Sequence, residues 1–352
     1  MGFSGIIERM TDSPEIPLFE TIKTLLEQAR RRVLQTVNTT MVMTYFEIGR
    51  LIVENEQKGE SKAVYGQKTI KQLSQALMQE FGKGFSLRNL ETMRRFYLTY
   101  RKTQTVSAQL EKTEKEPLLF RLSWSHYVFL IRLQEQERRF YEIESVENNW
   151  SLRELQRQFD SALYDRLRLS RNKMAVKELS EKGHLVNNPQ DAVKDPYVLE
   201  FLGLKEDISY TENELEQAII DKIEHFLLEL GKGFSFVGRQ QRFTFDEEHF
   251  FVDLVFYNRL LKCFVLIDLK LGKLKHQDLG QIQMYVNYYD RFVKTADENQ
   301  TIGIVLCKDK RESLVEITLP KDNTQIFASQ YQLYLPTKDE FRAQIESVVL
   351  DA

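Results

Sequence analysis

The sequence predicts an all-helical N-terminal domain followed by a compact α/β domain. Apolar residues recur every three or four positions through roughly the first 170 residues, a spacing typical of amphipathic helices. Beyond about residue 195, one helical pattern is followed by several short apolar runs and a second helix, which is typical of an α/β unit. We expect domains at 16–175 and 195–345, because residues 178–194 combine Gly, Asn, Pro and mixed charge as linkers do.

Composition indicates an ordinary globular protein. The 352 residues are 42% hydrophobic and 29% charged, which suits two folded domains. No apolar run approaches the roughly 20 residues that cross a bilayer, and residues 1–12 lack a secretory signal pattern, so we expect a cytoplasmic protein. A net charge of -3 does not by itself indicate a nucleic-acid partner, so such a partner must meet local basic patches. Cys263 and Cys307 lie in apolar runs, which favours buried free thiols.

Four helices are predicted in residues 16–101. The first has an apolar stripe, the second covers about 41–56 and the third about 68–81. The stripe of the first helix consists of Ile22, Leu25, Leu26, Ala29, Val33 and Val37. A glycine turn at 82–85 follows, and Ser86 can cap the fourth helix. Helix, glycine turn, helix is the outline of a helix-turn-helix.

The fourth helix is rich in arginine. Arg88, Arg94 and Arg95 fall largely off its apolar stripe, and Asn89 could bond a base edge or a phosphate. A solvated helix face explains the same pattern, so both interpretations stay open. Residues 102–115 are polar and have no stripe, which predicts a loop.

Helical pattern resumes after this loop and continues to the linker. The predicted segments are 122–133, 140–146 and a helix that begins with Ser151 and Glu154 as a capping box.

The second domain begins with a helix. Thr211 and Glu214 form its capping box, and Glu216 flanks its apolar stripe, which runs to Leu230. Short apolar runs then predict strands at about 234–237, 241–245, 250–257, 262–270, 301–307 and 331–335. These suit a mostly antiparallel sheet. A further helix from about Asp278 places Gln281 and Tyr285 four residues apart on one face.

Two of the predicted strands carry acids that an ordinary core strand excludes. Asp268 and Lys270 share one face of their strand, roughly 7 Å apart, because side chains alternate. Asp253 lies in the preceding run, and a turn within 258–262 predicts a hairpin. If the turn has an even number of residues, Asp253 falls on the face of Asp268 and Lys270.

Carboxylates without histidine or cysteine partners suit Mg²⁺, with Mn²⁺ as a substitute. Such an ion can activate water and offset phosphate charge, and a lysine beside it can stabilise the transition state. The alternative is a buried, hydrogen-bonded Asp253 with an Asp268–Lys270 ion pair at a strand end. Burying both acids on one face costs several kcal/mol unless a cation or donors compensate.

These residues resemble the PD-(D/E)XK nuclease superfamily, and Gln281-X-X-X-Tyr285 resembles the QxxxY element of its RecB-type branch. Three segments resemble the YhcG-like family of bacterial nucleases more closely: LLELGKGFSFVGRQ, FVDLVFYNRLLKCFVLIDLKLGKL and GQIQMYVNYYD. YGQKTIKQLSQALMQEFGKGFSLRNLETMRRFY and LSWSHY resemble that family's helical N-terminal domain, which has no assigned function. The resemblance extends from about residue 20 to 345.

The resemblance implies a restriction-endonuclease-like α/β domain with a mixed central sheet. It implies Asp253 and Asp268 as metal ligands, Lys270 as the residue that positions water or stabilises the transition state, and Glu216 as a further acid near the metal. Glu212 and Glu214 stay open as alternatives for this acid. Gln281 and Tyr285 would steady the lysine and the DNA strand. Two positions depart from the motif's name or commonest form: Val252 replaces its proline and Asp268 stands where glutamate is commoner.

The predicted function is a Mg²⁺-dependent endonuclease acting on DNA, whose helical domain recognises DNA or a partner. Candidate phosphate contacts are Arg239, Arg242, Lys273 and Lys275, in addition to the arginines of the fourth helix. The alternative is a non-catalytic nucleic-acid or protein-binding module on a nuclease-like fold, and RNA cleavage stays open. So does a homodimer, because such folds often cut two strands as dimers, although no sustained heptad is visible.

Overall fold

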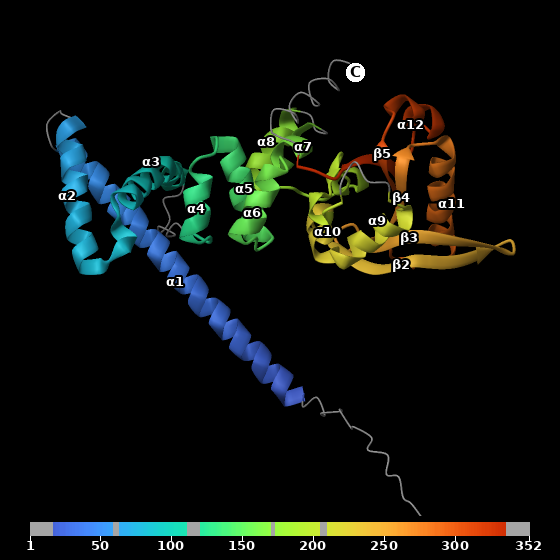
Figure 1. Cartoon of the computed structure of the whole chain (residues 1–352), viewed down its shortest axis with the longest axis horizontal. Coiled ribbons are helices and arrows are strands. Elements are labelled where there is room, and N and C mark those ends of the chain that lie inside the picture. Colours follow the sequence, from blue (N-terminus) through green and yellow to red (C-terminus); the bar gives the residue numbers. More distant parts are fainter. Residues whose placement is uncertain (1–16, 59–62, 111–119, 170–172, 205–209, 336–352) are drawn as a thin grey trace, which may run out of the picture. The chain divides into compact units, whose positions relative to one another are not determined.

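The computed structural model describes residues 17–58, 63–110, 120–169, 173–204 and 210–335, and the chain forms two compact units. Unit 1 covers Met1–Leu133 and unit 2 covers Gln134–Ala352. Figure 1 shows unit 1 as helical, whereas unit 2 combines helices with a sheet. Among the described residues, no helix is long and apolar enough to cross a membrane.

Unit 1 packs its helices around aromatic rings. Its elements are α1 (Pro17–Lys58), α2 (Ala63–Phe81), the 3-10 helix η1 (Lys83–Phe85), α3 (Leu87–Leu110) and α4 (Trp124–Leu130). The ring of Phe96 on α3 lies 5.0 Å from Phe120 and 5.2 Å from Tyr127, centroid to centroid. α1 can approach α3 closely because a side chain at Gly49 would collide with the Met93 carbonyl.

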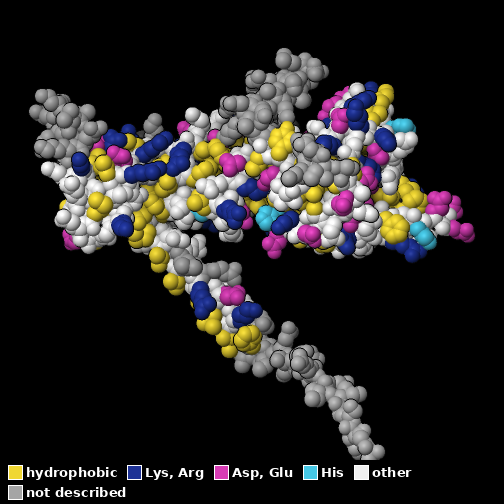
Figure 2. Space-filling model, viewed as in Figure 1, with side chains coloured by type: hydrophobic (Ala, Val, Ile, Leu, Met, Phe, Trp, Pro, Cys, Tyr) yellow, Lys and Arg dark blue, Asp and Glu magenta, His cyan; other side chains and the backbone are white. Residues whose placement is uncertain are grey.

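The structure corrects two predictions for α1. The helices predicted at 22–37 and 41–56 form one continuous helix, because residues 38–40 contain no glycine or proline and Thr44 bonds the Thr40 carbonyl within the helix. Within the described structure, the apolar stripe on the first half of α1 is exposed and not packed into a core. Its exposed members are Ile22, Leu25, Leu26, Val33 and Val37, and Phe19 before the stripe is exposed as well. Figure 2 shows these hydrophobic side chains beside basic ones along the helix.

The predicted helix, glycine turn, helix outline is present as α2, η1 and α3. Gly82 has φ 86°, a left-handed conformation that glycine adopts without strain. α3 runs to Leu110, so the loop prediction is wrong for residues 102–110, while 111–115 lie outside the described residues. The stretch 102–110 lacks the glycine or proline that would end a helix, so a missing apolar stripe alone did not predict a loop there.

Unit 2 contains a helical part followed by the sheet and its covering helices. The helices are α5 (Glu135–Glu147), α6 (Leu152–Asp160), α7 (Leu163–Leu169), α8 (Lys173–Lys182), α9 (Glu212–Asp221), α10 (Ile223–Leu230), α11 (His276–Phe292) and α12 (Glu312–Thr318), with 3-10 helices η2 (Pro189–Ala192) and η3 (Glu200–Leu202). The strands are β1 (Tyr197–Val198), β2 (Phe234–Phe245), β3 (Glu248–Asn258), β4 (Cys263–Lys273), β5 (Ile302–Asp309) and β6 (Ile326–Gln332). Both predicted capping boxes, at α6 and α9, are confirmed.

Within the described residues the strands form one sheet of order β1-β6-β5-β4-β3-β2. β2, β3 and β4 pair antiparallel, whereas β4, β5, β6 and β1 pair parallel. The mixed sheet implied by the family resemblance is therefore confirmed, and the mostly antiparallel sheet is wrong. α11 connects β4 to β5 as a crossover, and a crossover helix makes the strands on either side of it parallel.

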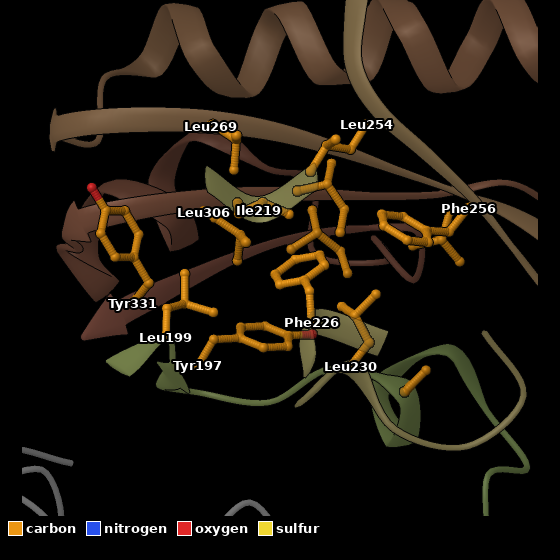
Figure 3. Close-up of a cluster of buried hydrophobic side chains, with 14 of the residues drawn as sticks. Tyr197, Leu199, Ile219, Phe226, Leu230, Leu254, Phe256, Leu269, Leu306 and Tyr331 are labelled. Atoms are coloured by element: carbon orange, nitrogen blue, oxygen red, sulfur yellow. The ribbon is translucent and has the colours of Figure 1, made fainter. Parts of the chain in front are cut away.

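Each face of the sheet is covered by a different pair of helices. α9 and α10 cover one face, where Ile219 and Phe226 pack on Leu254 and Leu269 (Figure 3). α11 and α12 cover the other face, where Tyr285 and Val305 lie in a second cluster. Cys263 and Cys307 are buried free thiols, as predicted.

Several elements of unit 2 differ from their predicted bounds, among them β2, the helix before it and β6. β2 is one strand where two were predicted, because it continues through a register shift between Phe236 and Gly238. The helix predicted through Leu230 breaks at Lys222 into α9 and α10, which turns Phe226 into the core although no glycine or proline marks the break. β6 covers Ile326–Gln332 instead of 331–335, since its polar residues hid the strand pattern.

A buried carboxylate joins the helical part of unit 2 to the sheet. Glu229 of α10 is fully buried and lies 2.6 Å from Arg166 of α7 and 3.3 Å from Arg157 of α6. It also accepts the Val198 amide at 3.0 Å. Burial alone would raise the pKa of Glu229, but Arg166, Lys194 and Arg157 outweigh burial and lower it to about 2. The carboxylate therefore stabilises the fold above its ordinary pKa, and this contribution is lost as pH falls toward 2.

A second ion-pair cluster lies between α5 and the start of β2. Lys232 contacts Glu144 at 2.8 Å and Glu147 at 2.7 Å, and Glu144 accepts the His184 amide at 2.7 Å. α5, α6 and α7 are thus joined to the sheet part of unit 2 through buried charges. These units differ from the predicted domains 16–175 and 195–345, whose bounds stay a prediction.

We expect Glu229→Gln to lower the free energy of unfolding of unit 2 by roughly 3–5 kcal/mol, because the buried Arg166 would lose its carboxylate partner, whereas Arg157 would keep Glu200. Urea denaturation followed by circular dichroism measures the change. Glu224→Gln, an exposed acid on the same helix, is the control and should stay within about 0.5 kcal/mol of the wild type. Equal stability of the two variants would contradict this account.

Candidate active site

The β3–β4 hairpin has the predicted register. The strands pair from Asn258↔Cys263 to Leu254↔Ile267 around a turn of four residues, 259–262, which is an even number. The next position of this register sets Asp253 opposite Asp268. Backbone pairing ends there, and the Leu269 amide donates to Asp253 Oδ2 at 2.8 Å instead. Asp253 is therefore held at the point where the two strands separate.

Asp268 is a buried acid beside a lysine. Its exposed fraction is 1%, and its Oδ2 lies 2.8 Å from Lys270 Nζ. Burial raises the pKa of Asp268, Lys270 offsets part of that effect and the charge of Asp253 adds to it, so the pKa reaches about 7. An acid with this pKa exchanges its proton close to neutral pH, as reactive groups in active sites do.

Glu216 and Asp253 are joined by a residue that the sequence analysis missed. The Gln240 Nε2 donates to Asp253 Oδ1 at 3.0 Å and also to Glu216 Oε2. Glu216 is buried on α9, and its pKa is raised by burial and by the charge of Asp253, while the bond from Gln240 lowers it. The sequence pattern that could have indicated Gln240 was the gap between the two strands predicted at 234–237 and 241–245, in which this residue lies.

The remaining predicted site residues lie on α11 and at the start of α9. The Gln281 amide donates to the Tyr285 hydroxyl, which confirms their predicted common face. Tyr285 is buried, and burial raises its pKa. Glu212, an alternative for the further acid, lies 3.9 Å from Lys270, whereas Glu214 is bonded to Thr211 in the capping box.

The candidate DNA contacts in unit 2 are exposed, and most have protein partners. Arg239 donates to Gln217 Oε1 at 2.6 Å, and Arg242 lies 3.0 Å from His249 Nε2. Lys273 lies 3.7 Å from Asp309. Lys275 precedes α11, where its backbone amide donates to the Asp278 carboxylate. The structure thus leaves these cations on the surface of unit 2.

The candidate DNA contacts in unit 1 divide into exposed and paired residues. Arg88 and Arg95 are exposed on α3, whereas Arg94 forms an ion pair with Glu56 at 2.8 Å. Asn89 is occupied on both sides, since it donates to the Gly84 carbonyl and accepts the Trp124 indole N–H at 3.2 Å. A contact from Asn89 to a base edge or a phosphate stays a prediction, since an amide has a second N–H and a second lone pair.

The donor set suits a hard cation held by two acids. Asp253 and Asp268 offer carboxylate oxygens, and Asp268 Oδ2 is buried with the Lys270 ammonium as its close partner among the described residues. Mg²⁺ is commonly held by one or two carboxylates while it keeps several waters. Within the described ranges, no three His, Cys, Asp or Glu side chains form a ready metal cage. Glu216, which reaches Asp253 through Gln240, stays a predicted ligand.

When a chelator keeps the site free of metal, the stability of unit 2 should depend on pH through Asp268. Its folded pKa of about 7 exceeds the ordinary value of 3.8, so the folded state keeps a proton that the unfolded state loses. The stabilisation of the folded state by this proton is complete below about pH 4. It falls by about 1.4 kcal/mol per pH unit as pH rises toward 7. We expect Asp268→Asn, which cannot ionise, to remove this slope, as thermal denaturation between about pH 5 and 7 measures. A constant difference from wild type over that range would contradict it.

Comparison with known proteins gives two family matches and one close relative. The YhcG PDDEXK nuclease domain matches residues 190–346, and the DUF1016 N-terminal domain matches residues 21–166. The chain is 39% identical over 345 residues to "Putative nuclease YhcG" of Escherichia coli (strain K12), which covers 92% of this chain and 91% of that protein.

Two solved structures match more distantly, a "repair endonuclease from Pyrococcus abyssi" and the "EndoMS-dsDNA2 complex". Each match has 16% identity and a TM-score of 0.25, and covers 38% of this chain and 50% of the other.

Proposed function

The chain belongs to the YhcG family of PDDEXK nucleases, and we propose that it is a metal-dependent endonuclease that hydrolyses phosphodiester bonds of DNA. The observation that carries the proposal is the buried Asp268 carboxyl, 2.8 Å from Lys270 and opposite Asp253. Perturbed acids of this kind gather where a charge must be bound or a proton moved.

Each side chain has a role in this reaction. Asp253 and Asp268 would hold Mg²⁺, or Mn²⁺ in its place, and the bound ion supplies charge that offsets the phosphate and lowers the pKa of a water. The Lys270 ammonium can donate to a phosphate oxygen or orient the attacking water. The water oxygen bonds to phosphorus while one bridging P–O bond breaks, and the bridging oxygen leaves with the electron pair and takes a proton from solvent. Glu216, whose pKa is raised by burial, can accept the proton of that water.

The other elements would place the substrate. Gln281 and Tyr285 would steady Lys270 and the DNA strand from α11. Arg239, Arg242, Lys273 and Lys275 would contact phosphates, since backbone neutralisation supplies most non-specific affinity. The helical N-terminal region would recognise DNA or a partner, and a homodimer would supply two sites for two strands.

We expect Asp268→Ala and Lys270→Ala to lower Mg²⁺-dependent cleavage by at least about 100-fold, because each removes charge at the reacting phosphate. Cleavage of plasmid, branched DNA and RNA measures this and compares the substrates. Arg259→Ala removes an exposed cation at the turn of the same hairpin and should cleave as wild type does. Equal cleavage by all three variants would refute the proposed chemistry. DNA binding without cleavage by the wild type would support the non-catalytic module.

The arginines of α3 give a separate test of DNA recognition. We expect Arg88→Ala and Arg95→Ala each to weaken duplex binding and to reduce its salt dependence, because both side chains are exposed. Fluorescence anisotropy at several salt concentrations measures both effects. Arg94→Ala is the matched control, since Arg94 pairs with Glu56 and should affect stability more than binding. Unchanged affinity in the Arg88 and Arg95 variants would remove α3 from the DNA interface.

A further inference from the structure

Gln240 stands at an irregular point of β2. On either side of it Arg239 pairs with Leu254 and Gln241 pairs with Val252, so Gln240 lies across from Asp253. Its φ of 45° is in the left-handed region, which is unfavourable for a residue other than glycine, asparagine or aspartate. A strained backbone directly opposite an active-site residue indicates that the side chain of the strained residue has a functional role.

The side chain of Gln240 donates two hydrogen bonds from one nitrogen, an arrangement that few other residues could provide. Its single Nε2 donates to Glu216 Oε2 on α9 and to Asp253 Oδ1 on β3. Ionised carboxylates only accept hydrogen bonds, so the two hydrogens of one amide nitrogen satisfy both acids without adding charge. A lysine there would bring a full positive charge, a glutamate a third negative one, and an asparagine is one methylene shorter.

The neighbouring residue makes a parallel contact with the same helix. Arg239 donates to Gln217 Oε1 at 2.6 Å, while Gln240 donates to Glu216. Two consecutive residues of β2 therefore hold two consecutive residues of α9. These contacts tie α9 to β2, the strand that pairs with the Asp253 strand β3.

We propose that Gln240 is a positioning residue, whose amide holds the Glu216 carboxylate one amide group away from Asp253 and aims it at the reacting water. The proposal rests on the nuclease function proposed above and assigns Gln240 no contact with DNA. Without the amide, Glu216 and Asp253 face each other as like charges, and the Glu216 side chain turns away.

Gln240→Gly tests the amide separately from the backbone, because glycine adopts the left-handed conformation without strain. We expect the Mn²⁺ affinity of this variant to fall by roughly 10–100-fold, because Gln240 also orients Asp253, a proposed metal ligand. Titration without DNA, followed by electron paramagnetic resonance, measures this affinity. Gln240→Asn should behave in the same way, since it keeps an amide and tolerates the backbone but cannot reach both acids. Gln241→Ala is the control and should bind Mn²⁺ as wild type does, because Gln241 bonds only the Arg239 carbonyl among the described contacts.

Cleavage kinetics give a second readout. At saturating Mn²⁺, Gln240→Gly should show a lower kcat with an unchanged KM for DNA, because the residue acts on Glu216 and not on the substrate. A raised KM with an unchanged kcat would overturn the positioning role.

A double-mutant cycle decides whether the amide joins the two acids when no metal is present. In chelator, the melting-temperature changes of Gln240→Gly and Glu216→Ala should not add in the double variant, because both remove the same bond. Additive changes, or wild-type Mn²⁺ affinity in Gln240→Gly, would overturn the proposal. If the wild type neither binds Mn²⁺ nor cleaves DNA, the nuclease function fails, and the cycle still decides whether Gln240 joins the acids.

Discussion

The pairing register of β3 with β4 is the constraint on which the candidate active site depends. Leu254 and Ile267 pack into the core beneath α9 and α10, so Asp268, between Ile267 and Leu269, faces the other side of the sheet. A slip of one residue would carry the apolar side chains out of that core and the acid into it. The free energy of core packing therefore also fixes where Asp253 meets Asp268.

Two buried carboxylates in unit 2 show how surroundings decide the role of an acid. Glu229 is compensated by Arg166, Arg157 and the Val198 amide, so its pKa falls and it stays ionised as part of the fold. Asp268 has one lysine and a nearby acid, so burial prevails and its pKa rises toward neutrality. Strong compensation gives a structural ion pair, whereas incomplete compensation leaves a group that can bind a cation or exchange a proton.

Local sequence patterns predicted most elements and misplaced those whose ends depend on distant contacts. α1 continues where two helices were expected, and α9 breaks from α10 without a local stop signal. β6 carries polar residues and is a strand because it pairs with β5. The parallel half of the sheet likewise follows from the α11 crossover, which strand patterns do not contain.

The sequence by itself determined the residues of the hairpin site. Strand alternation sets Asp268 and Lys270 on one face, and helical spacing pairs Gln281 with Tyr285. Each of these pairs joins residues that are close in the sequence, so the periodicity of a strand or a helix is enough to predict it. Asp253 joins the face of Asp268 and Lys270 only if the turn is even, a condition that the structure supplies.

Only the tertiary structure decided how α9 meets the hairpin and which charges compensate one another. Gln240 joins Glu216 to Asp253 across 24 and 13 positions of sequence, and Arg166 reaches Glu229 across 63. Such contacts depend on an irregular strand and on helix packing, for which a single sequence carries no periodic signal.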